Sequence, residues 1–275
     1  MNLFLACLIG GLAGSHASMW GMYKDSPHEG FTWPKYLRST WMSALIGLVL
    51  GVVLDLDLTN FSNIAVFFAV VYVTERGAIE YYKTFLRTED QSKYFIPMQF
   101  HVLGKVVESQ RSRLLLGAVY LVAVVAVVFG LDWFQKADHG LSPWLVVFII
   151  GSVGGWISAF GGAWKDAPLE GFQIFKFFRS PLVALAYAMV IGHFTHTYLF
   201  IAMGGLGYTI ASTETYKTFF FPSKPRGKFA GKPVDFPEML EKRQRFVPFY
   251  VLIWVFILTS FVLGFLGSHS GLLSP

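Results

Sequence analysis

The sequence is poor in charged residues and contains one cysteine. Asp, Glu, Lys and Arg make up 14% of the 275 residues, whereas they are about a quarter of an average soluble protein. A composition this far from the soluble average favours a lipid bilayer as the surrounding solvent. Cys7 has no second cysteine to pair with, so the chain forms no internal disulfide.

Motifs of the common cofactor and catalytic sites are also missing. The chain has no cysteine cluster, no glycine-rich phosphate loop and no Ser-His-Asp arrangement in a recognisable context. His193 and His196 lie three residues apart. With Asp55 and Asp57 they would offer two imidazoles and two carboxylates to zinc, although interfacial histidines usually hold no metal. The sequence therefore predicts no cofactor, no metal and no catalytic residue.

Long apolar segments dominate the chain. Hydrophobic residues make up 54% of it and aromatic residues 17%. A helix needs about 20 mostly apolar residues to cross a bilayer. Eight segments meet this need: 3–23, 40–57, 61–82, 114–133, 143–164, 180–198, 199–219 and 247–268. The sequence therefore predicts an all-α polytopic integral membrane protein with eight transmembrane helices.

The positions of the basic residues predict how the chain crosses the membrane. Of the 22 Lys and Arg, all but Lys136 fall toward the odd-numbered connections between the spans. Basic residues stay in the cytoplasm because they are poorly translocated. We expect these connections in the cytoplasm and both termini on the other side, in a cytoplasmic or organellar inner membrane. The basic face would meet anionic membrane lipids and no nucleic acid.

The chain contains an internal repeat. The segment KDSPHEGFTWPKYLRS, residues 24–39, returns as KDAPLEGFQIFKFFRS, residues 165–180, with nine of sixteen positions identical. Each half holds four predicted spans, an even number, so both copies enter the membrane in the same direction. We therefore expect two parallel four-helix membrane repeats, 1–136 and 137–275. A pseudo-twofold axis along the membrane normal would relate them.

The repeated segment carries the main candidate ligand-binding residues. In each copy we expect a Lys-Asp pair to end the first span, a proline to stop the helix and Glu-Gly to make a turn. A Lys and an Arg spaced i, i+3 then begin the next span and face one way. The candidates are Lys24, Asp25, Glu29, Lys35 and Arg38 in the first copy, and Lys165, Asp166, Glu170, Lys176 and Arg179 in the second.

Two interpretations of these charges remain open. The carboxylates either pair with the cations of their own loop and pin a tight helical hairpin, while spare cations reach lipid headgroups. Alternatively, both loops form one site for an anionic ligand, such as a lipid phosphate or a substrate carboxylate. Arg38 and Arg179 would then be bidentate donors.

Further charges are repeated at the ends of spans 3 and 7, within the sequence Glu-x-Tyr-Lys-Thr-Phe. A Glu three residues before a Lys favours an ion pair on the helix surface. We include all four among the candidate ligand-binding residues: Glu80, Lys83, Glu214 and Lys217.

Glu75 and Arg76 lie deeper in span 3. An ionisable residue inside a span is a functional candidate. Adjacent residues point about 100° apart on a helix, and a place near the membrane boundary would let both side chains reach water.

Small residues form a stripe along spans 1 and 5. They let helix backbones approach closely in a membrane, where no hydrophobic force drives helices together. The stripe either marks spans 1 and 5 as the central, tightly packed helices of the two halves or leaves room for a ligand or pore between the halves. Its members are Gly10, Gly14, Ser18 and Gly21, and Gly151, Gly155, Ala159 and Gly162.

The two long cytoplasmic connections differ from each other. Connection 86–113 contains YFIPMQFHVLGKVVESQR, which we expect to lie in the membrane interface as an amphipathic helix. Connection 220–246 is rich in Pro, Gly and Lys and is expected to be an extended strap. The two halves are therefore not expected to dock identical partners.

Three classes of function fit the sequence. Two pseudo-symmetric halves and a doubled charged segment favour transporter- or channel-like handling of an anionic small molecule or lipid. A non-catalytic structural or assembly subunit of a larger membrane complex is the alternative, because apolar, aromatic-rich helices also pack on other membrane proteins. An enzyme acting on lipid phosphates is less favoured, because it needs acid–base or metal groups beyond those seen here.

Overall fold

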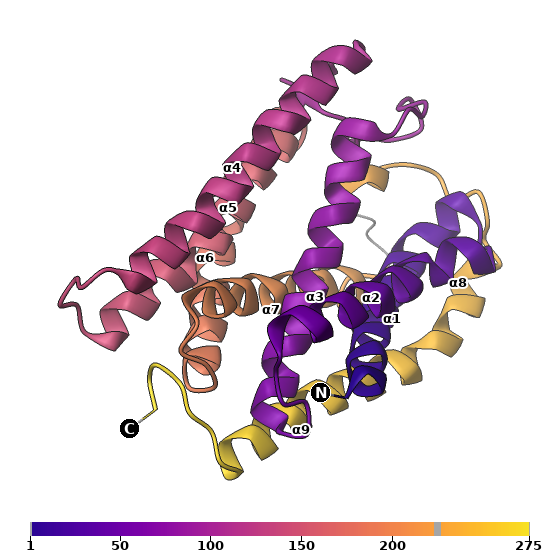
Figure 1. Cartoon of the computed structure of the whole chain (residues 1–275). Helices are drawn as coiled ribbons and strands as arrows, with labels where there is room; N and C mark the ends of the chain where they lie inside the picture. Colours follow the sequence, from indigo (N-terminus) through magenta and orange to yellow (C-terminus); the bar gives the residue numbers. More distant parts are fainter. Residues whose placement is uncertain (1, 223–226, 275) are drawn as a thin grey trace.

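The protein is almost entirely helical in the computed structural model, which describes residues 2–222 and 227–274 (Figure 1). The long helices are α1 (Leu3–Glu29), α2 (Trp33–Leu54), α3 (Phe61–Tyr81), α4 (Gln110–Lys136), α5 (Pro143–Glu170), α6 (Ile174–Gly192), α7 (Tyr198–Phe219) and α9 (Val247–Leu266). The shorter elements are the π-helical turn η1 (Tyr82–Leu86), the antiparallel strands β1 (His101–Val102) and β2 (Lys105–Val106), the 3-10 turns η2 (Gly227–Phe229) and η3 (Arg243–Phe246), and α8 (Met239–Lys242).

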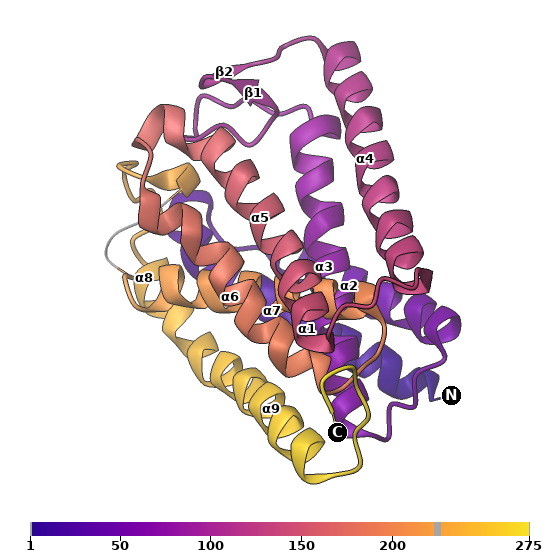
Figure 2. The same cartoon turned by 90° about the vertical axis from the view of Figure 1, so that its left-hand side faces the viewer.

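Seven helical segments are long and apolar enough to cross a membrane, which confirms that this is an all-α membrane protein. They are α1, α2, α3 with η1, α4, α5, α6, and the run from α8 through α9. Helix α7 coincides with the predicted span 199–219 and has 22 residues, but glycine, serine and threonine make it less apolar. An eighth span therefore stays a prediction. The two termini lie toward the same end of the molecule, opposite the hairpin β1–β2 (Figure 2).

Helices α3 and α7 cross at the centre of the molecule. The most apolar window of α3 is 78% buried, against 56% for α1 and 39% for α5. A Cβ added at Gly207 of α7 would lie 2.6 Å from the backbone oxygen of Ala69 in α3, so only glycine permits this approach. The Tyr208 hydroxyl donates to the Ala65 carbonyl at 2.7 Å. The most buried helix is thus α3 and not the predicted spans 1 and 5, although the tight packing predicted for those two spans is present.

The small-residue stripe closes the contact between the first two helices of each half. A Cβ at Gly14 would lie 2.2 Å from the Ser39 backbone oxygen, and one at Gly10 would lie 2.4 Å from that of Ser43. Both oxygens belong to α2. Glycine is therefore required where α1 meets α2.

The second half repeats this packing. A Cβ at Gly151 of α5 would lie 2.4 Å from the Ala188 Cβ of α6. The last members of the stripe differ, because a Cβ at Gly21 or Gly162 would have no atom within 4 Å. The stripe thus packs helices along most of its length and leaves space at its end.

The prolines of the repeated segment do not stop the helices, contrary to expectation. Helices α1 and α5 continue through Pro27 and Pro168 and end two residues later. The chain turns at Gly30 and Gly171, with φ of 71° and 82°. Positive φ is a conformation that glycine adopts without steric penalty, so the glycine and not the proline ends each helix.

The long connections also differ from expectation. Connection 86–113 forms no amphipathic helix but contains the hairpin β1–β2, which turns at Leu103 and Gly104 with φ of 51° and 80°. Valines on either side of a Leu-Gly pair favour strands around a tight turn. The described part of connection 220–246 includes η2, α8 and η3 and is only partly extended. Residues 223–226 lie outside the described residues.

Two glycines of α1 that lie three residues apart, Gly11 and Gly14, test the packing of the stripe. Alanine in a helix interior is about 0.5–1 kcal/mol more favourable than glycine. Gly11→Ala has open space for its Cβ, so it should keep or raise the melting temperature in detergent. Gly14→Ala should lower it, because the Cβ meets the α2 backbone. Equal changes in the two variants would contradict this account of the α1–α2 contact.

Candidate functional site

Both copies of the repeated segment line a single large cavity, which we call the chamber. Its volume is about 1060 Å³, and its walls come from α1, α2, α3, α5, α6, α7 and residues 227–243. All but Glu29 of the predicted ligand-binding residues line it: Lys24, Asp25, Lys35, Arg38, Glu80, Lys83, Lys165, Asp166, Glu170, Lys176, Arg179, Glu214 and Lys217. Segments far apart in the sequence therefore meet at one place.

The chamber is strongly cationic. Eleven Lys and Arg line it, against five Asp and Glu. Three of the lining cations are not among the ligand-binding residues predicted from the sequence: Arg76, Lys228 and Arg243. Lys228 and Arg243 lie in the second long connection, which gave no signal beyond its basic composition.

Ion pairs join the two halves across the chamber in a reciprocal way. The ammonium of Lys24 in the first half lies 3.5 Å from Glu214 Oε2 in the second. That of Lys165 in the second half lies 3.9 Å from Glu80 Oε2 in the first. Each glutamate also binds, at 3.0 Å, the lysine three residues further along its helix, as the spacing predicts.

Other carboxylates pair within their own copy of the segment. Lys35 binds Glu29. In the second copy, the Lys176 ammonium lies 2.7 Å from Asp166 and 3.0 Å from Glu170. Pairing inside the loop is therefore real for these residues, but it leaves most of the chamber's cations unaccounted for.

The arginines of the repeated segment both face the chamber. Arg38 is exposed and forms no ion pair with any residue that the structure describes. Its counterpart Arg179 lines the chamber and also the small cavity beside it. An anion entering the chamber would meet guanidinium groups, which bind carboxylate and phosphate through paired hydrogen bonds.

A buried ion pair lies at the inner end of the chamber. The Arg76 guanidinium holds Glu75 through two contacts of 2.5 and 2.6 Å, and it donates to Ser39 Oγ at 3.1 Å. It also lies over the Trp20 ring. The expectation that both charges reach water is wrong, because each is buried and they neutralise one another. Only Arg76 lines the chamber.

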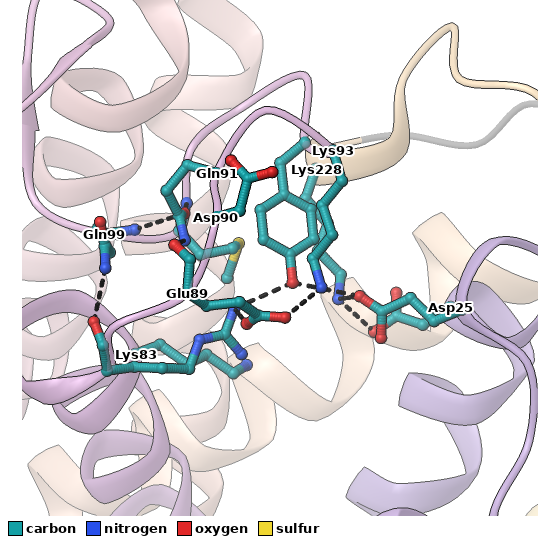
Figure 3. A network of polar contacts seen from close by, with 12 residues as sticks. Asp25, Lys83, Glu89, Asp90, Gln91, Lys93, Gln99 and Lys228 are labelled. Carbon is teal, nitrogen blue, oxygen red and sulfur yellow. Dashed lines mark hydrogen bonds and ion pairs between the residues drawn. The ribbon is translucent and has the colours of Figure 1, made fainter.

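The second long connection is fastened to the end of α1 by Lys228, as Figure 3 shows in part. Its ammonium lies 2.9 Å from Asp25 Oδ2 and 3.1 Å from Glu29 Oε1. Burial by itself lowers the pKa of Lys228, but the two carboxylates outweigh it and raise this pKa above its usual value. The first connection joins the same cluster, because the Tyr94 hydroxyl donates to Glu29 at 3.2 Å.

Each long connection covers the repeated segment of the other half. In the first half, His28 Nδ1 lies 2.6 Å from the Pro233 carbonyl oxygen of the second connection. In the second half, His101 of strand β1 lies 3.0 Å from the Lys165 carbonyl oxygen, and Trp164 Nε1 donates to the His101 carbonyl (Figure 2). The two connections differ in sequence, but each contacts the repeated segment of the other half.

The zinc alternative receives no support. Within residues 2–222 and 227–274, no group of three or more His, Cys, Asp or Glu is placed to hold a metal ion. His196 contacts Ser270 at 2.9 Å, and the His193 ring packs on Trp144 and Phe265.

Removing the Lys228 ammonium tests how the second connection is held. Lys228→Met leaves two carboxylates at the end of α1 without this cation, so we expect a loss of about 2–3 kcal/mol of unfolding free energy. Adding Asp25→Asn should restore part of it. Lys232→Met is the control, since that ammonium contacts a carbonyl oxygen at the surface. Thermal unfolding in detergent measures these effects, and equal losses at both lysines would contradict the assignment.

Comparisons with known proteins find nothing similar. No family model, no curated protein and no solved structure matches this chain. Its function therefore has to be inferred from the chamber itself.

Proposed function

We propose that the protein binds an anionic small molecule or the anionic headgroup of a lipid in the chamber and moves it in a transporter- or channel-like manner. The observation that carries this proposal is the charge of a cavity lined by both copies of the repeated segment. Eleven cations line it against five carboxylates.

The excess of cations persists when neighbouring carboxylates are included. Glu29 and Glu75 do not line the chamber, but they pair with Lys35 and Arg76, which do. Counting these two, seven carboxylates stand against eleven cations. A cavity lined by an excess of one sign of charge raises the local concentration of ions of the opposite sign, so this excess favours an anion. Phosphate and carboxylate fit best, because arginine binds both through paired hydrogen bonds.

The reciprocal ion pairs support the parallel arrangement of two four-helix repeats. Lys24 and Lys165 occupy equivalent positions of the repeat, and each pairs with the equivalent glutamate of the other half. A pseudo-twofold axis along the membrane normal would produce this exchange and would place both basic segments on the same, cytoplasmic, side. A site between two such halves is the usual place for substrate in transporters built from repeats.

The alternative, a non-catalytic subunit of a larger membrane assembly, has support from α4. Only 11% of its most apolar window is buried, against 78% for α3. Lipid or another membrane protein would cover this helix. The alternative accounts for α4 but not for the cationic chamber.

Reconstitution in liposomes tests the proposal. Liposomes that contain the wild-type protein should take up labelled inorganic phosphate, glycerol 3-phosphate or phosphatidic acid faster than liposomes without protein. Arg38→Ala combined with Arg179→Ala should reduce the rate by about tenfold or more, because two bidentate donors are lost. No uptake of any probe, together with stoichiometric co-purification with other membrane proteins, would favour the subunit alternative.

The adjacent glycines Gly161 and Gly162 of α5 supply a matched test of the chamber. A Cβ at either position would have no atom within 4 Å, but only Gly162 lines the chamber. Gly162→Phe should therefore abolish most binding and uptake, and Gly161→Phe should leave both near the wild-type level. Similar behaviour of the two variants would argue against a ligand in this cavity.

A further inference from the structure

We infer, building on the proposed function, that the ligand is an amphiphile with a phosphate or carboxylate headgroup. It would reach the chamber sideways from the bilayer, between the cytoplasmic-facing tips of α5 and α6.

A small cavity adjoins the chamber at these tips. Its volume is about 80 Å³, and we call it the side opening. It lies beside the chamber, because six residues line both spaces: Gly162, Asp166, Gln173, Lys176, Arg179 and Lys217. The remainder of its lining is mostly alanine and phenylalanine, including Ala163, Ala167 and Phe177.

An aromatic surface lies directly outside the side opening. The Phe177 ring packs within 5.2–5.8 Å of the rings of Phe160, Phe172 and Trp156. Phe160 and Phe172 remain 63% and 61% exposed. A cationic chamber thus meets an apolar surface across a few residues. This arrangement matches a molecule with a charged head and an apolar tail, whereas a free anion would gain nothing from the aromatic rings.

The equivalent place in the first half has different surroundings, because the counterparts of the side-opening residues, such as Gly21, Gly30 and Lys35, line the chamber itself. A Cβ at Gly30 would lie 3.2 Å from the Phe236 ring, and the Phe246 ring packs 5.8 Å from that of Phe31. At Gly171, the counterpart of Gly30, no atom lies within 4 Å of such a Cβ. Both phenylalanines that cover the first half belong to the second long connection. The two copies of the repeated segment therefore differ in their covering: phenylalanines of the second connection pack against the turn at Gly30, whereas no atom that the structure describes lies within 4 Å of a Cβ at Gly171.

The charges place the headgroup beyond the side opening. At the threshold, Lys176 is already neutralised by Asp166 and Glu170. Arg38 lines the chamber but not the side opening and forms no ion pair with the described residues. A headgroup would therefore pass the threshold and bind inside the chamber, while its tail stays against the phenylalanines.

Blocking the side opening without touching the chamber tests this inference. Ala163 lines the side opening only, so Ala163→Trp should narrow it. Ala186→Trp on α6 is the control, because Ala186 is exposed and lines neither cavity. Both variants are checked for thermal stability in detergent. Binding is measured in nanodiscs with fluorescent phosphatidic acid and, separately, with soluble glycerol 3-phosphate.

We expect Ala163→Trp to weaken phosphatidic acid binding by about tenfold or more, equivalent to about 1.4 kcal/mol, and to leave glycerol 3-phosphate binding unchanged. Equal weakening of both probes would overturn the inference. Wild-type binding of glycerol 3-phosphate but not phosphatidic acid would also overturn it and leave the proposed function standing. If neither probe binds, the proposed function itself fails.

Cross-linking of the unmodified protein gives a second readout that does not depend on a variant folding. Phosphatidic acid with a diazirine in its acyl chain should label residues 156–178, where the aromatic surface lies. Labelling confined to other helices would overturn the sideways route.

Discussion

Many charges in this protein lie at the ends of apolar helices, where they lose part of their contact with water, so pairing stabilises them. That pairing determines how the two halves meet. Lys24 reaches Glu214, and Lys165 reaches Glu80, so each half completes the charge of the other. Removing one partner from such a pair leaves an uncompensated charge, which is far more unfavourable than never having had the pair. The repeated charges are therefore conditions of assembly as well as candidates for binding.

Glycine has two effects along α1 and α5, depending on what lies opposite it. Gly14 permits backbone contact with α2, where a side chain would collide with Ser39. Gly21 and Gly162 face the chamber, where a Cβ would meet nothing. Close packing at one end of a helix and open space at the other thus arise from one stripe of small residues. The crossing of α3 and α7, made possible by Gly207, occupies the centre instead.

The long connections give the two copies of the repeated segment different surroundings. Each covers the repeated segment of the other half, through Pro233 against His28 and through His101 against Lys165. The second connection supplies Phe236 and Phe246, which pack against the turn after α1. The turn after α5 stays open beside an aromatic surface. The different surroundings of the two turns therefore come from the connections and not from the membrane helices.

The sequence by itself determined the helical membrane class, the approximate positions of the long helices and most of the charged residues that line the chamber. These follow from local properties: apolar runs of spanning length, and charged residues repeated at equivalent positions. Tertiary structure decided the rest, because it depends on which segments meet. No local pattern reveals that Arg76 folds onto Glu75, that Lys228 binds Asp25, or that glycine and not proline ends α1. Whether a small residue packs against a neighbour or leaves space for a cavity likewise depends on the helix opposite. The spacing of residues along the sequence does not show which helix that is.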